Sequence, residues 1–241
     1  MDVNTDRFAM RDIDVKLYNI CSKGTVEEVL RLINQGANPS APHWDLPLDP
    51  DLNVSLYTED YYCVHEAALN PDVRVLNALV EHGADPNQFD YWDRQPLAWE
   101  VGANSLEIVR RLVELGNDPC NEDGDGGTVL SDAALNPDIR VVEFLLEHGA
   151  KVDEAAIGQS ELDRALKEGT PERIRFFVEH GSDLNYICRD LLMDAPVENI
   201  RSLLECGLNP NIKEDYGDER VVNLLDPVRR ALFVEFGADP G

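Results

Sequence analysis

The stretch Glu81-His82-Gly83-Ala84-Asp85-Pro86-Asn87 decides the fold, because its glycine-centred phrase returns along the whole sequence. In most copies a proline stands three positions after the glycine. The glycines are Gly36, Gly83, Gly116, Gly149, Gly181, Gly207 and Gly237, at intervals of 47, 33, 33, 32, 26 and 30 residues. A period near 33 residues predicts stacked helical repeats rather than one closed globule.

Each glycine follows a segment with the apolar spacing of an amphipathic helix. Before Gly83 the apolar residues are Val73, Leu76, Leu79 and Val80, and the same spacing precedes the glycines at 36, 116, 149 and 207. This pattern buries one face of a helix. The glycine allows the chain to leave the helix in a left-handed conformation, and the proline prevents the helix from resuming.

A second apolar segment precedes each of these helices and carries a family resemblance. The segments 63–68, 95–99 and 128–134 read CVHEAA, QPLAW and TVLSDAA, in phase with their glycines. They resemble the ankyrin repeat, whose unit is T-P-L-H-x-A-A, a turn, a second helix and G-A-D-x-N. The resemblance implies an all-α ankyrin solenoid of seven repeats, two of them degenerate, with short β-hairpin fingers and of a bacterial or viral type. At His65 it implies a ring that supports loop hydrogen bonds.

The phase of the repeats divides one continuous domain, residues 1–241. Residues 1–40 predict an N-terminal cap, in which Thr25 and Glu28 have the spacing of a capping box. Residues 41–56 form an insertion, which either binds a partner or packs Trp44 on its own scaffold. Residues 57–218 hold the internal repeats, in which 70–72 and 136–138 read Asn-Pro-Asp and predict turns between helices. Residues 219–241 predict the C-terminal cap, with Arg230 in place of a core aliphatic.

The net charge of -26 bounds the function. A protein that binds nucleic acid by neutralising phosphates needs a basic face, so that class is disfavoured. Residues 1–40 carry 6 acids and 5 bases, whereas residues 41–100 carry 12 acids and 2 bases. The acidity serves either solubility or the attraction of a basic partner.

Signatures of catalysis and of metal binding are missing from the sequence. There is no H-E-x-x-H, paired C-x-x-C, G-x-S-x-G or phosphate-binding glycine loop. The acidic run 121–127 lacks the bidentate glutamate of a calcium loop, because residue 134 is alanine. Five scattered cysteines favour reduced thiols, and no signal peptide is evident, so we predict a cytoplasmic, non-enzymatic protein without metal or cofactor.

Aromatic residues provide the candidate binding site. Eight of the seventeen aromatics fall within the 56 residues from Trp44 to Trp99. Tyr91 and Trp92 are expected at a finger tip, and Trp99 on the concave face at the same repeat position as Glu66 and Asp132. Exposed tryptophan and tyrosine often anchor interfaces, although these rings could instead pack with the insertion as a local core. The predicted partner-binding residues are Trp44, Glu66, Asp90, Tyr91, Trp92, Asp93, Trp99, Asp125 and Asp132.

The resemblance implies a protein–protein interaction module with no reaction of its own. We expect a monomer that binds a protein with a basic surface through its concave face and fingers, without direct contact to nucleic acid or membrane. One alternative is an acidic inhibitor or immunity-type protein that blocks a nuclease or a toxin. A second alternative is a structural subunit that self-associates end to end.

Overall fold

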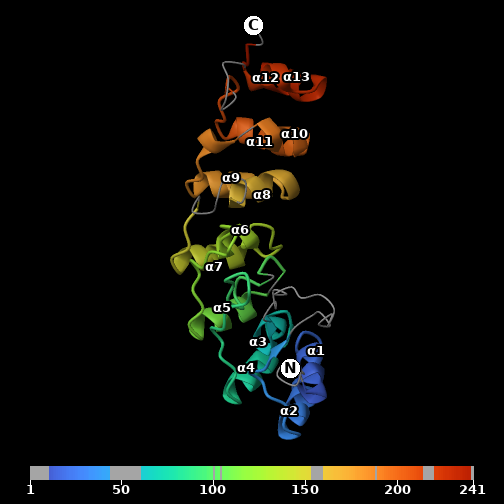
Figure 1. The fold of residues 1–241 in the computed structure, drawn as a ribbon. Coiled ribbons are helices and arrows are strands. Elements are labelled where there is room, and N and C mark those ends of the chain that lie inside the picture. The colour runs from blue at the N-terminus through green and yellow to red at the C-terminus, as the bar shows by residue number, and fades with distance from the viewer. Residues whose placement is uncertain are drawn as a thin grey trace, which may run out of the picture.

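The helices of the chain stack, mostly in pairs, into one elongated column, with the first described helices at one end and the last at the other (Figure 1). This computed structural model describes residues 11–43, 61–99, 101–103, 105–152, 160–187, 189–213 and 220–239. Trp44 and most of the predicted insertion at 41–56 lie outside the described residues.

We number the helix pairs as units along the column. Units 1 and 2 are α1 (Asp12–Cys21) with α2 (Val26–Asn34), and α3 (Cys63–Ala68) with α4 (Val73–Glu81). Unit 3 has one helix, α5 (Leu106–Glu114), preceded by turns, and unit 4 is α6 (Val129–Ala133) with α7 (Ile139–Glu147). Units 5 to 7 are α8 (Glu161–Glu168) with α9 (Pro171–Glu179), α10 (Arg189–Asp194) with α11 (Val197–Glu205), and α12 (Val221–Leu224) with α13 (Pro227–Glu235). First helices contact first helices, as α1 contacts α3, and second helices contact second helices, as α9 contacts α11.

The glycine phrase ends each second helix as the sequence predicts. Gly83 has a φ of 97°, its N–H donates to Val80 O at 3.0 Å, and the N–H of Ala84 donates to Leu79 O at 3.0 Å. This pair of bonds satisfies the last carbonyls of α4 and requires the left-handed glycine. The other six phrase glycines also have positive φ. The predicted capping box of α2 is confirmed as well, because Thr25 and Glu28 exchange both of its hydrogen bonds.

The apolar stripes form one core that runs the length of the column. Leu76 and Leu79 of α4 are fully buried, and Val73 and Val80 pack against them at the edge. The same core cluster continues from Leu17 in unit 1 to Ala238 after unit 7. The amphipathic pattern of the second helices is therefore confirmed.

Unit 3 differs from the predicted pattern. Residues 95–99 form turns instead of the expected helix, since the N–H of Ala98 donates to Gln95 O and that of Trp99 donates to Pro96 O, each across three residues. Gly102 follows in what would be the last helical turn, where glycine is a poor helix former. A Cβ at Gly102 would lie 2.8 Å from Asp132 O, so the close approach of unit 4 requires glycine there.

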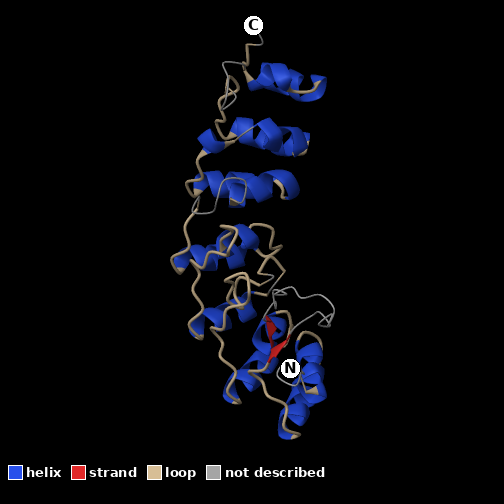
Figure 2. Cartoon of the chain, viewed as in Figure 1, coloured by secondary structure: helices blue, strands red, loops and turns tan. Residues whose placement is uncertain are grey.

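Strand pairing contributes little to the described part of the chain. It comprises the two-stranded ladder of β1 (Pro42–His43) and β2 (Tyr61–Tyr62), visible near the N-terminal end in Figure 2, and single bridges at Glu122–Thr128 and Lys213–Arg220. The short fingers therefore depend on turns and side-chain hydrogen bonds rather than on extended hairpins.

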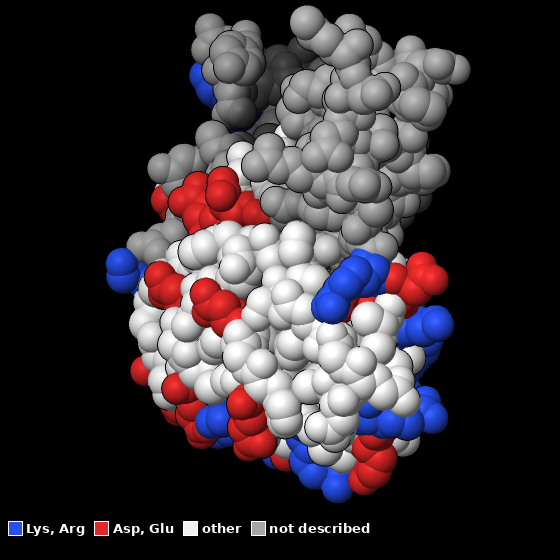
Figure 3. All heavy atoms as spheres, turned by 60° about the horizontal axis from the view of Figure 1, so that its bottom comes forward, with Lys and Arg blue, Asp and Glu red and all other residues white. Residues whose placement is uncertain are grey.

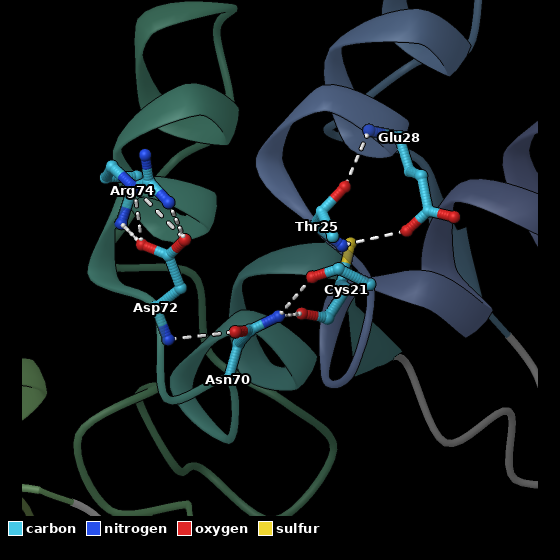
Figure 4. A network of polar contacts seen from close by, with 7 residues as sticks. Cys21, Thr25, Glu28, Asn70, Asp72 and Arg74 are labelled. Carbon is cyan, nitrogen blue, oxygen red and sulfur yellow. Dashed lines mark hydrogen bonds and ion pairs between the residues drawn. The ribbon is translucent and has the colours of Figure 1, made fainter.

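Asparagine side chains connect consecutive units. Asn70, which is buried before α4, donates its amide to Cys21 O at 2.8 Å and to Gly24 O at 2.9 Å in unit 1, while its Oδ1 accepts from the N–H of Asp72 (Figure 4). The carbonyls at the end of α1 thus find donors in the next unit. The Asn-Pro-Asp turn therefore also has an inter-unit role that the local sequence pattern does not reveal.

The same connection, which we call the backward tether, recurs along the column. Asn136 donates to Val101 O at 2.7 Å, Asn199 to Leu166 O at 3.0 Å and Gly169 O at 3.1 Å, and Arg229 to Leu192 O at 2.8 Å and Ala195 O at 2.7 Å. Arg173 of unit 5 likewise donates to the Asn136 carbonyl of unit 4. In unit 7, Arg230 is exposed and its guanidinium donates to Val222 O and Leu225 O of its own unit.

Candidate functional site

The segment Phe89–Asp93, which we call the aromatic finger, presents side chains to solvent ahead of unit 3. Phe89, Tyr91 and Trp92 are 47%, 41% and 38% exposed, respectively. The other large hydrophobic side chains exposed within the described ranges are Val228 and Val234, on α13 at the far end of the column. The rings of Tyr91 and Trp92 contact edge to face, with centroids 5.4 Å apart. Tyr91 and Trp92 belong to the binding residues predicted from the sequence, whereas Phe89 does not.

Asp90 holds the aromatic finger in shape from inside. Its side chain is fully buried, and its Oδ1 accepts from the N–H groups of Trp92 at 2.8 Å and Arg94 at 2.9 Å. Its Oδ2 accepts from the Arg94 guanidinium, with Nε at 2.9 Å. Asp90 was expected to steer a partner through solvent, but its buried and paired carboxylate gives it a structural position instead.

The finger of unit 4, residues 121–127, supports the aromatic finger. The N–H of Gly124 donates to Trp92 O at 2.9 Å, and the Asn121 amide donates to Asp93 O at 3.1 Å. Asp93 adopts a φ of 57°, the one positive value outside glycine among the described residues. An aspartate can tolerate that left-handed conformation. The aromatic finger is therefore held both by its own Asp90 and by bonds from the finger of unit 4.

Exposed acidic residues occur in the aromatic finger and in the finger bonded to it. Asp93 follows Trp92 directly, and Glu122 and Asp125 lie within two residues of Gly124, whose N–H contacts the Trp92 carbonyl; all three acids are exposed. Asp123 between them has a structural role, since its carboxylate accepts from the N–H groups of Asp125 and Gly127. Glu122 was not predicted, although its place in the acidic run 121–127 could have indicated it.

Three other predicted residues contact neighbouring units instead of projecting freely. Glu66 accepts from Tyr18 Oη at 3.2 Å, and Asp132 forms an ion pair with Arg164 at 2.9 Å. Trp99 is half-buried, with its ring centroid 5.5 Å from those of both Tyr61 and His65. These side chains occupy the same repeat position, and each joins its unit to an adjacent one. Trp44 lies outside the described residues.

His65 joins the first helix of unit 2 to Arg94, the residue that follows the aromatic finger. Its Nε2–H donates to Arg94 O at 3.3 Å, in agreement with the loop-supporting role that the resemblance implies. Burial is the main cause that lowers the pKa of the His65 imidazole below its usual 6.5, while the nearby Asp90 carboxylate opposes that shift. The ring is therefore neutral in the folded chain near neutral pH.

Acidification is expected to weaken the fold through His65. Because the pKa of His65 is lower in the folded than in the unfolded chain, protons favour the unfolded state. This contribution to stability is present above about pH 6.5 and is lost as the pH falls below it. The free energy of unfolding in urea is measured for wild type and His65→Ser at pH of about 7.5 and again at about 5.5. The variant carries the residue that unit 4 has at this position, and we expect it to lose less stability on acidification; an equal loss would contradict the assignment.

The charge of the column is not uniform. Seen from the N-terminal end, Lys and Arg stand beside Asp and Glu around a largely uncharged surface (Figure 3). This mixed surface agrees with the nearly balanced count in residues 1–40, and the acidic excess begins farther along the sequence.

The described residues contain neither a metal-binding cluster nor a membrane-spanning helix. In the part of the chain that the structure describes, His, Cys, Asp and Glu form no group of three or more that could hold a metal ion. None of the described helices has the length and apolarity that crossing a bilayer requires.

Comparison with known proteins identifies the repeats. The family model for ankyrin repeats in three copies matches residues 64–156 and 97–188, which together span just over half of the chain. The chain is 28% identical over 166 residues to the ankyrin repeat protein nuc-2 of Neurospora crassa, covering 63% of this chain and 15% of that protein. It is 24% identical over 187 residues to the putative palmitoyltransferase ZDHHC13 of Danio rerio, covering 73% and 29%, respectively.

A viral relative is similar over a larger share of its length. The putative ankyrin repeat protein R598 of Acanthamoeba polyphaga mimivirus is 27% identical over 202 residues, covering 75% of this chain and 60% of that protein. The chain thus spans less than two thirds of each of these relatives. The matched repeats, the glycine-ended helix pairs and the stacked column agree, and the chain belongs to the ankyrin repeat family.

Proposed function

We propose that this chain binds a protein with a basic surface through the aromatic finger and the adjoining finger of unit 4. Ankyrin repeats indicate a protein–protein interaction module. What supports the finer proposal is one observation: Phe89, Tyr91 and Trp92 are exposed together on a fixed finger beside Asp93, Glu122 and Asp125. Exposed aromatic clusters rimmed by polar groups are typical of interaction sites.

The aromatic and acidic residues have different roles in this proposal. The rings supply contact area at a low cost in conformational entropy, and they hold the complex once it has formed. The carboxylates attract a basic partner and mainly raise its association rate. Glu66, Trp99 and Asp132 stiffen the scaffold behind the finger through their contacts with adjacent units.

Trp92→Ala is expected to reduce partner affinity at least about tenfold while the chain stays folded. A pull-down from the lysate of the source cell at low and high salt identifies a basic partner that wild type captures and salt releases. Affinity for that purified partner and urea unfolding are then measured for each variant.

Two control variants make this result specific. Val234→Ala removes an exposed apolar side chain at the other end of the column and should leave affinity unchanged. Trp99→Ala should lower stability, because Trp99 packs on Tyr61 and His65. Equal affinity of wild type and Trp92→Ala would place the binding site elsewhere.

A further inference from the structure

We propose that the aromatic finger receives an arginine side chain of the partner. The inference rests on the proposed function and specifies the chemistry of its central contact. Its basis is the juxtaposition of the exposed rings of Tyr91 and Trp92 with the exposed carboxylates of Asp93, Glu122 and Asp125.

The charge of this surface selects a cation. An apolar partner segment would cover the rings but would also remove water from carboxylates that gain no new partner, which costs free energy. An acidic segment would be repelled. A cation over a ring face is attracted by the ring quadrupole and, at the same time, by the neighbouring carboxylates.

The arginines of residues 86–128 already contact other side chains of the chain. Between residues 86 and 128 the basic residues are Arg94, Arg110 and Arg111. Arg94 pairs with Asp90, and Arg111 donates to Asn77 and Glu114. Arg110 lies over the Phe144 ring at 4.5 Å from its centroid, which is the same type of contact that we infer at the finger. The cation that we infer for the finger is therefore not one of these three side chains.

Arginine fits this surface better than lysine. Its planar guanidinium can stack on an indole or phenol ring while its edge donates two hydrogen bonds to a carboxylate. Lysine has a compact, strongly hydrated ammonium that must lose more water to make the same contacts. Asp90 accepts a hydrogen bond from the Trp92 N–H, and Gly124 and Asn121 donate hydrogen bonds to carbonyls of the finger. Because these bonds fix the finger before binding, little conformational entropy is lost when the contact forms.

Titration of the full-length ¹⁵N-labelled chain with three blocked pentapeptides tests the inference. The peptides have two central residues that are both arginine, both lysine or both leucine, between glycines. We expect saturable shifts of the Trp92 indole N–H and of the backbone amides of 91–93 and 122–125 with the arginine peptide. Its dissociation constant should be at least about threefold lower than that of the lysine peptide, and the leucine peptide should leave these signals unchanged.

Variants separate the rings from the charge. Trp92→Leu keeps an apolar side chain but removes the ring, and Asp93→Asn removes the charge with a residue that tolerates a φ of 57°. Each should weaken arginine-peptide binding about threefold or more, whereas Glu198→Gln, at an exposed acid of α11, should have no effect. Circular dichroism and urea unfolding confirm that each variant is folded.

The outcomes distinguish this inference from the proposed function. Equal binding of the arginine and lysine peptides, or shifts spread over all acidic surfaces, overturns the arginine contact. Preferential binding of the leucine peptide overturns it in favour of an apolar partner. If Trp92→Ala abolishes capture of the cellular partner while the arginine peptide does not select the finger, the proposed function holds and the arginine contact is wrong.

Discussion

Asp90→Ala is expected to destabilise the chain by about 2 to 3 kcal/mol and to abolish binding through the aromatic finger. The substitution removes the acceptor of two backbone N–H groups, those of Trp92 and Arg94, and of the Arg94 guanidinium. Arg94 is 25% exposed, so water compensates part of the lost ion pair and the cost stays below that of a fully buried pair. Urea unfolding measures the stability, and the amide spectrum of residues 89–94 reports on the shape of the finger.

Two companion variants identify the cause of this effect. Asp90→Asn keeps an oxygen that can accept from the backbone and loses only the charge, so it should cost clearly less than Asp90→Ala. Asp125→Ala removes the same kind of side chain from an exposed position on the adjoining finger and should change stability by less than about 0.5 kcal/mol. If Asp90→Ala leaves the amide spectrum of the finger unchanged, the buried carboxylate does not hold it.

Asn70→Ala is expected to cost about 2 to 4 kcal/mol of stability, although it removes only a small polar side chain. It leaves the carbonyls of Cys21 and Gly24 without their donor and the N–H of Asp72 without its acceptor, at a site that is 3% exposed. Unit 1 should also separate from the cooperative unfolding of the column, because solenoid units are coupled only through their interfaces. Urea unfolding should then show a lower denaturant slope or a second transition.

The chemistry of the tether predicts an order among the Asn70 variants. Asn70→Asp has the same shape, but its carboxylate cannot donate and would face the two carbonyl oxygens, so it should destabilise at least as much as alanine. Asn185→Ala provides the matched control, because Asn185 is exposed and bonds only to Asp183 of its own turn among the contacts described. A cost for Asn70→Ala no greater than that of the control would show that the tether contributes nothing.

The sequence predicts the column well because its determinants are local. The left-handed glycine after each second helix, as at Gly83, and the apolar stripe before it depend on a single unit. The turns at 95–99, which the sequence did not predict, precede Gly102, where the approach of Asp132 O from the next unit requires glycine. The spacing of residues along the sequence does not show how closely Asp132 O approaches Gly102.

The candidate site was only partly predictable for a similar reason. Tyr91, Trp92, Asp93 and Asp125 are exposed as expected. In contrast, Asp132 contacts Arg164, Trp99 contacts His65 and Glu66 contacts Tyr18, and each pair is more than 30 residues apart in the sequence. Nothing in the local pattern indicates which side chain of an adjacent unit lies opposite. The burial of Asp90 did have a local signal, because an aspartate four residues before an arginine across a tight turn favours side-chain bonds to the turn.

The backward tethers have a consequence for how such a chain can lengthen or shorten over generations. Each tether is asymmetric: a side chain of Asn70, Asn199 or Arg229 donates to main-chain carbonyls of the preceding unit. Every unit offers those carbonyls whatever its side chains are. A tethered unit that is duplicated or exchanged therefore brings its own donor side chain, and its acceptors are main-chain carbonyls of the preceding unit. The addition of a whole unit needs no matching substitution in the preceding unit. A change within the aromatic finger, in contrast, must preserve its hydrogen bonds with the finger of unit 4.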